Sequence, residues 1–397
     1  MPSIASPARV VAVPASSASF IANGGRDPDF HRSHEIGLVP GEHVRVTDDR
    51  GNETGIAIAD PENSKLRVFA TPADGFTKID GALLGWRVER ALAWRTQLGL
   101  PGADHAYHLI HGAADGLPGF ACDVMGRVAI IYAYSEGLRP LASTLAEAVV
   151  GFAKLDGAVI KLRVRGGAAE VTQDIVGKVP ETLIVTEHDV HYEIHPLGGL
   201  NVGLFTDMRE HRRALARFVA GKRVLNLFSY TASLGVICAR SGAATVTNVD
   251  TSAGVNAWAA GNFTRSGFDL KKDKRWKFEA AEAGRFLARA EREKEQYDVI
   301  LIDPPGASSA GGVSWALGRD YPELIAKACA VIPPGGLLWL ASNAAELGSL
   351  AKLAHKGVRA ANRVAAVLEQ GGLPPEYPTP AIQATDRYLQ VCLLRIM

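Results

Sequence analysis

The sequence predicts an α/β protein whose C-terminal half folds around a mostly parallel sheet, preceded by a small α/β domain and an N-terminal β-domain. The chain has 397 residues, more than one hydrophobic core usually organises. Short β-type runs punctuated by Asp, Asn and Gly fill the first part of the chain. From about residue 191, buried-type strands alternate with helical segments, which is typical of βαβ units. We therefore expect domains at 1–80, 81–190 and 191–397.

The first two domains show a change from strand to helix periodicity. In the N-terminal domain, strands are expected at Glu42–Thr47, Thr54–Ala59 and Lys65–Phe69. Leu83–Leu98 has apolar residues at helical spacing and opens the second domain. The second domain is then expected to contain a turn-rich stretch at 111–119, strands at Phe120–Asp123, Val128–Tyr134 and Ala158–Val164, and a helix at Leu138–Phe152.

The third domain alternates strands and helices before a terminal hairpin. Five strands and three helices, one of them at Arg209–Val219, are expected to precede the hairpin. The expected strands are Val224–Phe228, Thr245–Val249, Trp276–Ala280, Tyr297–Ile302 and Gly336–Ala341; the other helices are Ala253–Ser266 and Pro322–Val331; the hairpin pairs Ala365–Glu369 with Tyr388–Ile396.

Composition and charge exclude several classes of protein. Apolar residues make up 47% and charged residues 21%, which rules out a disordered, collagen-like or coiled-coil chain. The net charge of +1 does not indicate a strongly basic nucleic-acid binder, although a local basic face remains compatible with it. No apolar run approaches the roughly 20 residues that span a bilayer, so no membrane segment is expected.

The four cysteines, Cys122, Cys238, Cys329 and Cys392, lie far apart and form no C-x-x-C pair. A disulfide scaffold or a zinc site is therefore not expected, no other metal site is indicated, and a reducing, cytoplasmic location fits best. Residues 1–25 lack acidic side chains, as targeting segments do, but basic residues are sparse. The sequence favours a tail leading into a strand around Val10–Val13.

Two acidic residues end strands of the predicted parallel sheet. Asp250 follows the second strand, where an acidic side chain can accept hydrogen bonds from ribose hydroxyls. The first strand–helix turn, Asn226–Gly235, lacks the G-x-G-x-x-G of dinucleotide binders. This favours a nucleoside cofactor without phosphates over NAD. Asp303 ends a buried strand and is followed by Pro304 and Pro305, which make a rigid turn at the ligand edge of the sheet.

These motifs resemble a known family. The run from Gly199 to Arg209, the turn from Val224 to Thr231, Val249–Ser252 and Asp298–Pro305 are similar to those of bacterial S-adenosylmethionine-dependent methyltransferases of large-subunit ribosomal RNA. The resemblance is to the PUA-domain-containing, cytosine-5 methyltransferase-like group. It covers residues 82–397, with a weaker likeness in the N-terminal domain. It implies a class I methyltransferase domain with a Rossmann-like sheet, a PUA-like RNA-binding domain at 1–80, and S-adenosylmethionine as cofactor.

The resemblance also assigns roles to residues of this chain. Asp250 is expected to hold the ribose, Ser252 to lie beside the adenine, and Glu282 to lie near the adenine amino group. Asp303 is expected to bind the target base and to be catalytic, besides bordering the cofactor. The methionine end of the cofactor would be lined by Asn226, Phe228, Ser229, Tyr230 and Thr231, and the pocket closed by Phe205, Asp207 and Arg209.

One departure bears on the acceptor atom. Cytosine-5 members carry a nucleophilic cysteine in a Ser-Cys-Ser sequence after the fifth strand, whereas this chain has Ser342-Asn343-Ala344. Without a thiolate, transfer to a base nitrogen is chemically easier to defend than transfer to cytosine C5. The loop also reads Tyr-Thr-Ala-Ser where the family usually has Tyr-Thr-Gly-Gly.

RNA, and ribosomal RNA by resemblance, is the expected partner. The cationic stretch Lys271–Lys277 and the arginines Arg209, Arg212, Arg213 and Arg217 are candidate contacts, although such runs are often solvated faces. His195, His211 and His355 show no metal-ligand spacing. Two alternatives stay open: a methyltransferase of small molecules or proteins, and a non-catalytic RNA-binding relative. The sequence also leaves a homodimer open.

Overall fold

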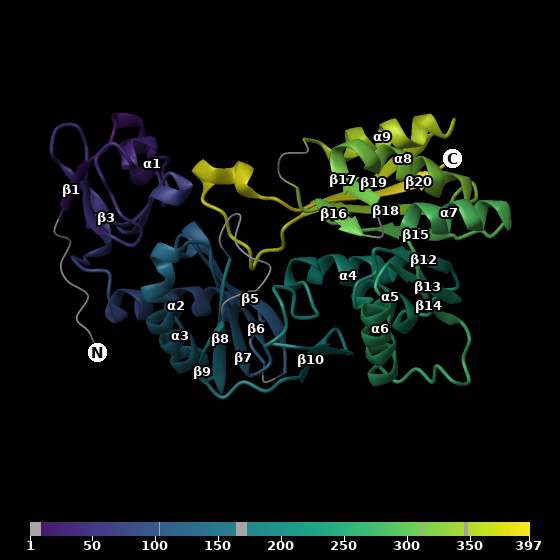
Figure 1. Cartoon of the computed structure of the whole chain (residues 1–397). Coiled ribbons are helices and arrows are strands. Elements are labelled where there is room, and N and C mark those ends of the chain that lie inside the picture. The colour runs from purple at the N-terminus through teal and green to yellow at the C-terminus, as the bar shows by residue number, and fades with distance from the viewer. Residues whose placement is uncertain (1–8, 103, 164–172, 311–312, 345–347) are drawn as a thin grey trace. The chain divides into compact units, whose positions relative to one another are not determined.

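The computed structural model divides the chain into two compact units, each with its own sheets (Figure 1). It describes residues 9–102, 104–163, 173–310, 313–344 and 348–397. Residues 1–8 of the expected N-terminal tail lie outside this description, as does the expected strand end at Val164. The first unit comprises Met1–Val185, Ile194–Val202 and Pro375–Ala384; the second comprises Thr186–Glu193, Gly203–Pro374 and Thr385–Met397.

The first unit opens with a four-stranded sheet in the order β1-β2-β3-β4, in which β1 runs parallel to β2 and the other neighbours are antiparallel. The three expected strands are confirmed. The helix α1 was not expected from the sequence, because its short Ala/Ser-rich run carries no clear apolar stripe. The elements are β1 (Arg9–Ala12), α1 (Ala15–Ala22), β2 (His43–Thr47), β3 (Glu53–Asp60) and β4 (Lys65–Ala70).

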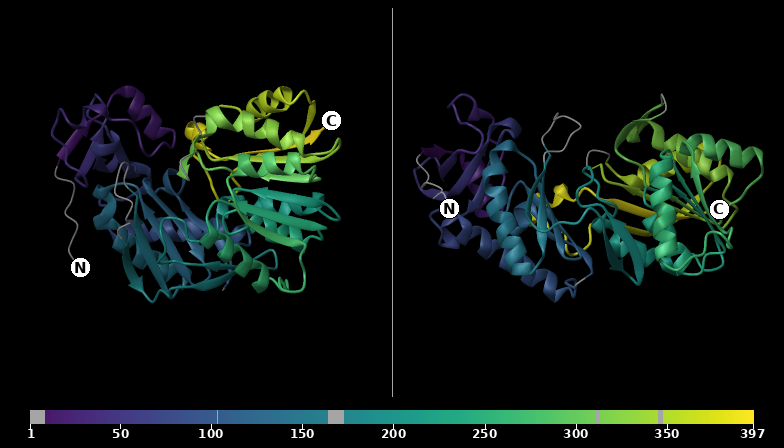
Figure 2. Two further views of the ribbon diagram at one scale, coloured as in Figure 1. Left: turned by 45° about the vertical axis from the view of Figure 1, so that its right-hand side comes forward. Right: turned by 60° about the horizontal axis from the view of Figure 1, so that its bottom comes forward.

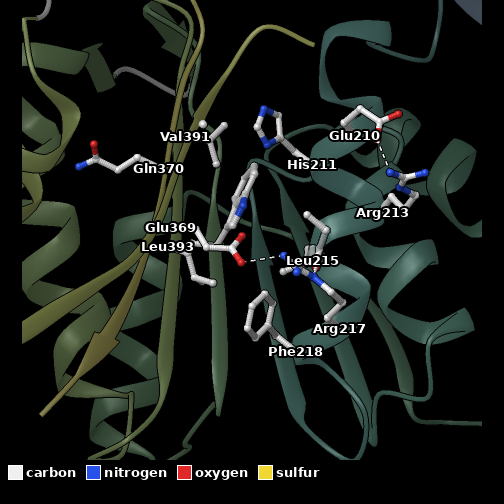
Figure 3. Close-up of a pocket in the computed structure, with 13 residues that line it drawn as sticks. Glu210, His211, Arg213, Leu215, Arg217, Phe218, Glu369, Gln370, Val391 and Leu393 are labelled. Carbon is white, nitrogen blue, oxygen red and sulfur yellow. Dashed lines mark hydrogen bonds and ion pairs between the residues drawn. The ribbon is translucent and has the colours of Figure 1, made fainter. Parts of the chain in front are cut away.

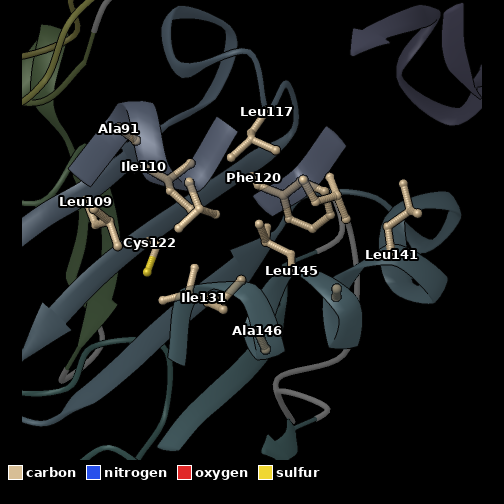
Figure 4. Close-up of a cluster of buried hydrophobic side chains, with 14 of the residues drawn as sticks. Ala91, Leu109, Ile110, Leu117, Phe120, Cys122, Ile131, Leu141, Leu145 and Ala146 are labelled. Carbon is tan, nitrogen blue, oxygen red and sulfur yellow. The ribbon is translucent and has the colours of Figure 1, made fainter. Parts of the chain in front are cut away.

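A five-stranded sheet in the order β5-β6-β7-β8-β9 follows in the same unit, with α2 and α3 packed on a core of aliphatic side chains (Figure 4). Asp80 begins α2 by accepting hydrogen bonds from the backbone N–H groups of Ala82 and Leu83. Strand β5 was not expected, because His108 interrupts its apolar run. The elements are α2 (Gly81–Gln97), β5 (Ala106–His111), β6 (Phe120–Met125), β7 (Val128–Ala133), α3 (Arg139–Ala153), β8 (Gly157–Leu162) and β9 (Gln173–Gly177).

The second unit is built on a seven-stranded sheet in the order β14-β13-β12-β15-β18-β20-β19, with the hairpin of β10 (Leu183–Glu187) and β11 (Val190–Ile194) where the chain enters it. Its first five strands are parallel, and β20 is antiparallel to both β18 and β19. The strands are β12 (Arg223–Leu227), β13 (Thr245–Asp250), β14 (Trp276–Ala280), β15 (Val299–Ile302), β18 (Leu337–Ser342), β19 (Ala365–Gly372) and β20 (Gln390–Ile396).

Helices cover both faces of this sheet (Figures 1 and 2). Helices α4, α5 and α6 lie on one face, and α7, α8 and α9 on the other. The expected α/β class, the parallel strands and the terminal hairpin are confirmed, whereas α7 and α9 had not been expected. The helices are α4 (Arg209–Leu215), α5 (Ser233–Arg240), α6 (Ala253–Arg265), α7 (Ala283–Arg292), α8 (Leu317–Ala330) and α9 (Leu350–Ala360).

Two helix boundaries differ from the expectation. Helix α8 begins at Leu317 rather than at Pro322, so Pro322 lies inside the helix as its sixth residue, where it removes one backbone hydrogen bond of the helix. The helix expected at Arg209–Val219 ends at Leu215 and continues as the 3-10 turn η7 (Ala216–Phe218). A short antiparallel pair, β16 (Ala307–Ala310) and β17 (Val313–Ala316), precedes α8.

A buried ion pair attaches α4 to the β10–β11 hairpin. Arg212 is fully buried, and its Nε and Nη2 donate to the two carboxylate oxygens of Glu187 at 2.5 and 2.8 Å. Nη2 also donates to the backbone oxygen of Phe205 at 2.9 Å. Glu187 and Tyr192 raise the pKa of Arg212 above its ordinary value despite burial, which lowers it. This bidentate geometry compensates both charges inside the unit.

We predict that Arg212→Ala lowers the free energy of unfolding by about 3–5 kcal/mol, because it leaves the Glu187 carboxylate buried without its counter-charge. Urea denaturation followed by circular dichroism measures this loss. The double variant Arg212→Met/Glu187→Leu should recover most of the stability, since no buried charge remains. Arg292→Ala, which removes an exposed arginine from α7, is the matched control and should leave the midpoint unchanged. A midpoint equal to that of the wild type in Arg212→Ala would contradict the prediction.

Candidate functional site

The candidate site lies at the carboxyl edge of the seven-stranded sheet, where β12, β13 and β15 end side by side. The register pairs Leu227 of β12 with Val249 of β13 and with Ile302 of β15. Asp250, the last residue of β13, and Asp303, which follows β15, are therefore brought to the same edge as the loop after β12. Open α/β sheets bind ligands at this edge.

The loop that follows β12 has an unusual backbone. Phe228, Tyr230 and Ala232 have positive φ angles of 55°, 46° and 58°, a region that side chains other than glycine rarely adopt. Alternation with ordinary residues turns successive backbone groups toward the same side. Ala232 is also the residue that stands where the resembling family usually has its first glycine. Strained backbone of this kind is found at ligand-binding sites.

Hydrogen bonds hold this loop against the segment that precedes α4. The Thr231 hydroxyl donates to the backbone oxygen of Gly203 at 2.6 Å, and the Asn262 amide donates to the backbone oxygen of Thr231 at 3.0 Å. The Tyr230 ring lies 5.4 Å from that of Phe205 and 6.0 Å from that of Trp258, measured between ring centroids. The structure thus brings Phe205, Tyr230 and Thr231 together, and it adds Trp258, which sequence reasoning had treated only as part of a helix.

Asp250 occupies the centre of the site. Its two carboxylate oxygens accept hydrogen bonds from the backbone N–H groups of Tyr230 at 3.1 Å and Ser252 at 3.0 Å. These bonds fix the carboxylate between the β12 loop and α6, and its remaining lone pairs can accept from ribose hydroxyls. The Ser252 hydroxyl begins α6 by accepting from the N–H of Val255 at 3.2 Å.

Two expected cofactor residues have structural partners of their own. Glu282 is the N-cap of α7 and accepts from the N–H groups of Gly284 and Arg285, both at 2.8 Å. Asn226 is 1% exposed, and its amide donates to the Asn248 side chain at 3.0 Å, beneath the loop. Gly235 of α5 packs directly on this amide pair, since a Cβ there would lie 2.1 Å from Asn248 Oδ1.

The Ser229 hydroxyl is a buried polar atom with no hydrogen-bond partner in the described part of the chain. A hydroxyl left without a partner in a buried loop costs free energy unless a ligand completes it. Ser229, the positive-φ backbone and the Asp250 carboxylate together fit a nucleoside cofactor that carries no phosphate. They supply acceptors for ribose hydroxyls and a close backbone approach.

The surroundings of Asp303 favour the protonated form of its carboxyl group. Although part of residue 303 reaches the surface, burial of its carboxyl group and the negative charge of Asp207 raise its pKa to about 7, and Arg212 opposes the rise. The Asp207 carboxylate accepts from the Tyr388 hydroxyl at 2.9 Å. An acidic group with this pKa is half ionised near neutrality, which suits a proton acceptor.

Backbone contacts fix the turn that contains Asp303. The Tyr321 hydroxyl lies 2.9 Å from the backbone oxygens of both Ile302 and Ala341, so it joins the ends of β15 and β18. Neither Tyr321 nor Tyr388 was singled out from the sequence as a site residue. Tyr388 precedes a strand and Tyr321 lies in a helix, so neither carried a local motif that indicates a site.

Asn343 lies at the acceptor turn, because a Cβ on Gly306 would approach its Oδ1 within 3.9 Å. All four cysteines are buried. Burial raises the pKa of Cys238, Cys329 and Cys392, and that of Cys122 in β6 of the first unit, above the ordinary value. Such thiols are not poised to form a nucleophilic thiolate.

The candidate basic contacts are placed differently from the expectation. Lys271–Lys277 precedes and enters β14, hence lies at the amino edge of the parallel sheet, opposite the site. Asp273 lies 2.7 Å from Arg275 within it. Arg212 is buried against Glu187 and cannot contact RNA. The Arg209 side chain, expected to close the pocket, is mostly covered and lies 2.9 Å from Glu210.

Two searches of the described residues bear on metals and membranes. They contain no group of three His, Cys, Asp or Glu side chains arranged to hold a metal ion. None of the helices in the described ranges combines the length and the hydropathy that a bilayer-spanning segment needs.

Comparisons with known proteins agree with this geometry. A family model of S-adenosylmethionine-dependent methyltransferases matches residues 131–391. The chain is 28% identical over 364 residues to ribosomal RNA large subunit methyltransferase I of Klebsiella pneumoniae, covering 90% of each chain. It is 30% identical over 307 residues to the protein of the same name from Shewanella denitrificans, covering 75% of each.

Solved structures share the fold. The crystal structure of the methyltransferase SMU.776 complexed with SAH superposes with a TM-score of 0.84 at 21% identity, covering 98% of this chain and 100% of that chain. A methyltransferase from Streptococcus mutans gives a TM-score of 0.83 with the same identity and coverage. The likeness therefore extends over both units described above.

We predict that Asp250→Ala weakens S-adenosylmethionine binding by about 1.5–3 kcal/mol, because it removes a charged acceptor for the ribose hydroxyls. Isothermal titration calorimetry measures the affinity. Asp269→Ala, which removes an exposed carboxylate from the loop after α6, is the control and should bind like the wild type. Unchanged affinity in a folded Asp250→Ala protein would refute the assignment.

Proposed function

This chain belongs to the family of S-adenosylmethionine-dependent methyltransferases, and we propose that it methylates a base of RNA, with ribosomal RNA of the large subunit as the first candidate. The observation that carries the proposal is Asp303, an aspartate of raised pKa in a rigid Asp-Pro-Pro turn beside the cofactor loop. The relatives that match 90% of the chain are named for a ribosomal RNA substrate. A match over 90% of the chain leaves about 40 residues unmatched, so it must include part of the N-terminal domain 1–80, for which we propose an RNA-binding role.

We further propose that the acceptor is a base nitrogen rather than cytosine C5. Transfer to C5 requires a nucleophile that adds to C6 and activates the ring. Asn343 lies beside Gly306, where the resembling enzymes carry that cysteine, and an amide cannot act as this nucleophile. The four cysteines are buried with raised thiol pKa values. A base nitrogen needs only correct positioning and a proton acceptor.

In this mechanism S-adenosylmethionine supplies an electrophilic methyl group on its sulfonium. Asp250 holds the ribose, and the loop at 228–232 surrounds the methionine end. The Asp303 carboxylate accepts a hydrogen bond from the base and orients its nitrogen toward the methyl group. Bound S-adenosylmethionine would supply the methyl group and take back the electron pair of its sulfur–methyl bond, and Asp303 would accept the proton that the methylated nitrogen releases.

We propose that the reaction takes place in the cytoplasm. Four free cysteines fit a reducing compartment, and an RNA substrate fits the cytoplasm. A homodimer is compatible with the sequence, and light scattering measures it directly. The most direct test of the function is mass spectrometry of ribosomal RNA nucleosides from a strain that lacks the gene. Loss of one methylated nucleoside supports the proposal, and an unchanged profile contradicts it.

We predict that kcat/KM for RNA methylation rises about tenfold per pH unit below pH 7 and levels off above it. The pKa of Asp303 is raised to about 7, so its ionised, proton-accepting form is lost as the pH falls through that value. A pH–rate profile from pH 5 to 9 measures this. Asp303→Asn should be nearly inactive, and its residual activity should not rise with pH below pH 7. Its affinity for S-adenosylmethionine should equal that of the wild type. A wild-type profile that is flat between pH 5.5 and 8 would exclude Asp303 as the base.

We predict that no covalent protein–RNA adduct forms on RNA that contains 5-fluorocytidine, because the site has no thiolate to add to the pyrimidine. Denaturing gel electrophoresis of the incubated mixture detects such an adduct. The Cys→Ser variants at 122, 238, 329 and 392 should each keep methyl transfer when they remain folded. A crosslink that disappears in one of these variants would restore the cytosine-5 assignment.

A further inference from the structure

A groove of about 530 Å³ lies in the second unit, separate from the residues expected to bind the cofactor. One wall is the segment from α4 to η7, and the floor and other wall are β18, β20 and β19 (Figure 3). Leu215 and Phe218 face Val391 and Leu393 across it. Its volume is in the range of small-ligand pockets.

The groove begins close to the acceptor turn. Helix α4 starts two residues after Asp207, whose carboxylate accepts from Tyr388 at 2.9 Å, just before β20. His211, on the first turn of α4, lies 2.7 Å from the backbone oxygen of Gly372 at the end of β19. Val391, the second residue of β20, lines the groove. Val391 pairs with Ala341 of β18, and the Tyr321 hydroxyl joins the backbone oxygens of Ala341 and Ile302, the residue before Asp303. A ligand at this end of the groove would therefore be a neighbour of a base held at the acceptor turn.

The surfaces of the groove suit a flat aromatic ring. Trp339, which is 3% exposed, forms part of the floor, and the partly buried Phe218 forms part of the wall. The Gln370 side chain points away from the groove (Figure 3), so the aromatic and aliphatic side chains determine what the groove can hold. An apolar slot with aromatic side chains can stack a nucleobase.

The charges of the groove favour the base over the phosphate backbone. Arg213 lies 3.1 Å from Glu210, and Arg217 lies 2.7 Å from Glu369. Burial lowers the pKa of His211, so this side chain adds no charge at neutral pH. The lining is therefore electrically balanced, which suits an uncharged ring. Both arginines are more than half exposed, so each can leave its weak pairing and contact a phosphate outside the groove.

We propose that this groove binds an unpaired base of the RNA substrate that flanks the methylated nucleotide, stacked against Phe218 with its phosphate held by Arg217. The proposal rests on the proposed RNA function and adds to it a second point of recognition on the methyltransferase domain. A base enters such a slot only when it is out of its helical stack, so the groove selects single-stranded or bulged RNA around the target.

The test compares Phe218→Ala, Phe218→Tyr and the control Arg292→Ala in steady-state methylation of a large-subunit ribosomal RNA fragment at saturating S-adenosylmethionine. Loss of a stacked base should raise KM for RNA about tenfold in Phe218→Ala and leave kcat and the KM for S-adenosylmethionine unchanged. Phe218→Tyr should restore the wild-type KM, because the ring is kept. In wild-type protein, RNA that contains 4-thiouridine should photo-crosslink to the peptide that contains Phe218.

Three results would overturn the proposal. An unchanged KM for RNA in Phe218→Ala, with wild-type methylation intact, rejects the groove as a base site and leaves the proposed function standing. A smaller particle mass by light scattering in Phe218→Ala, with an unchanged KM for RNA, would assign the groove to a second copy of the chain. A wild-type protein that methylates no RNA, yet retains S-adenosylmethionine binding, rejects the proposed function and the groove assignment with it.

Discussion

The buried pair of Arg212 and Glu187 links several parts of the second unit. It fixes α4, which forms one wall of the groove, and through the Phe205 backbone oxygen it fixes the segment beside Tyr230. The positive charge of Arg212 also limits the rise of the Asp303 pKa. An uncompensated charge in either partner would be costly, so the pair holds α4 and the segment at Phe205 in one geometry.

That fixed surrounding allows the strained loop after β12 to persist. Three residues with side chains in the left-handed region cost about 1–2 kcal/mol each. Asp250, Asn262 and the Thr231–Gly203 contact offset this cost with hydrogen bonds to the loop. Because Ala232 carries a Cβ where the resembling family has glycine, the loop depends more heavily on these bonds here. The same bonds hold the backbone of the loop in the conformation that we propose approaches the cofactor.

The sequence predicted the features that depend on the local pattern of residues. It could not predict the features that depend on contacts between residues far apart in the chain. Apolar runs that end in Asp250 and Asp303 indicated both carboxylates, because parallel strands end at one edge. The burial of Arg212 depends on Glu187, 25 residues earlier, and nothing near either residue indicates it. Lys271–Lys277 was predicted to contact RNA from its charge alone, although the direction of β14 puts it at the edge of the sheet opposite the candidate site. Glu282 was predicted to lie near the adenine, whereas its hydrogen bonds at the N-terminus of α7 became visible only in the structure.

The raised pKa of Asp303 and the loss of the cysteine are chemically consistent with each other. Transfer to a base nitrogen generates a cationic product whose proton must leave, and a carboxylate with a pKa near 7 is a stronger base than an ordinary aspartate. Transfer to C5 would need both a thiolate and a base, and an amide at position 343 supplies neither. The candidate cofactor loop departs from the family pattern at Ala232 and Ser233, where the change is between small residues. The change at position 343 replaces a nucleophile by an amide, so it alters the chemistry open to the acceptor side.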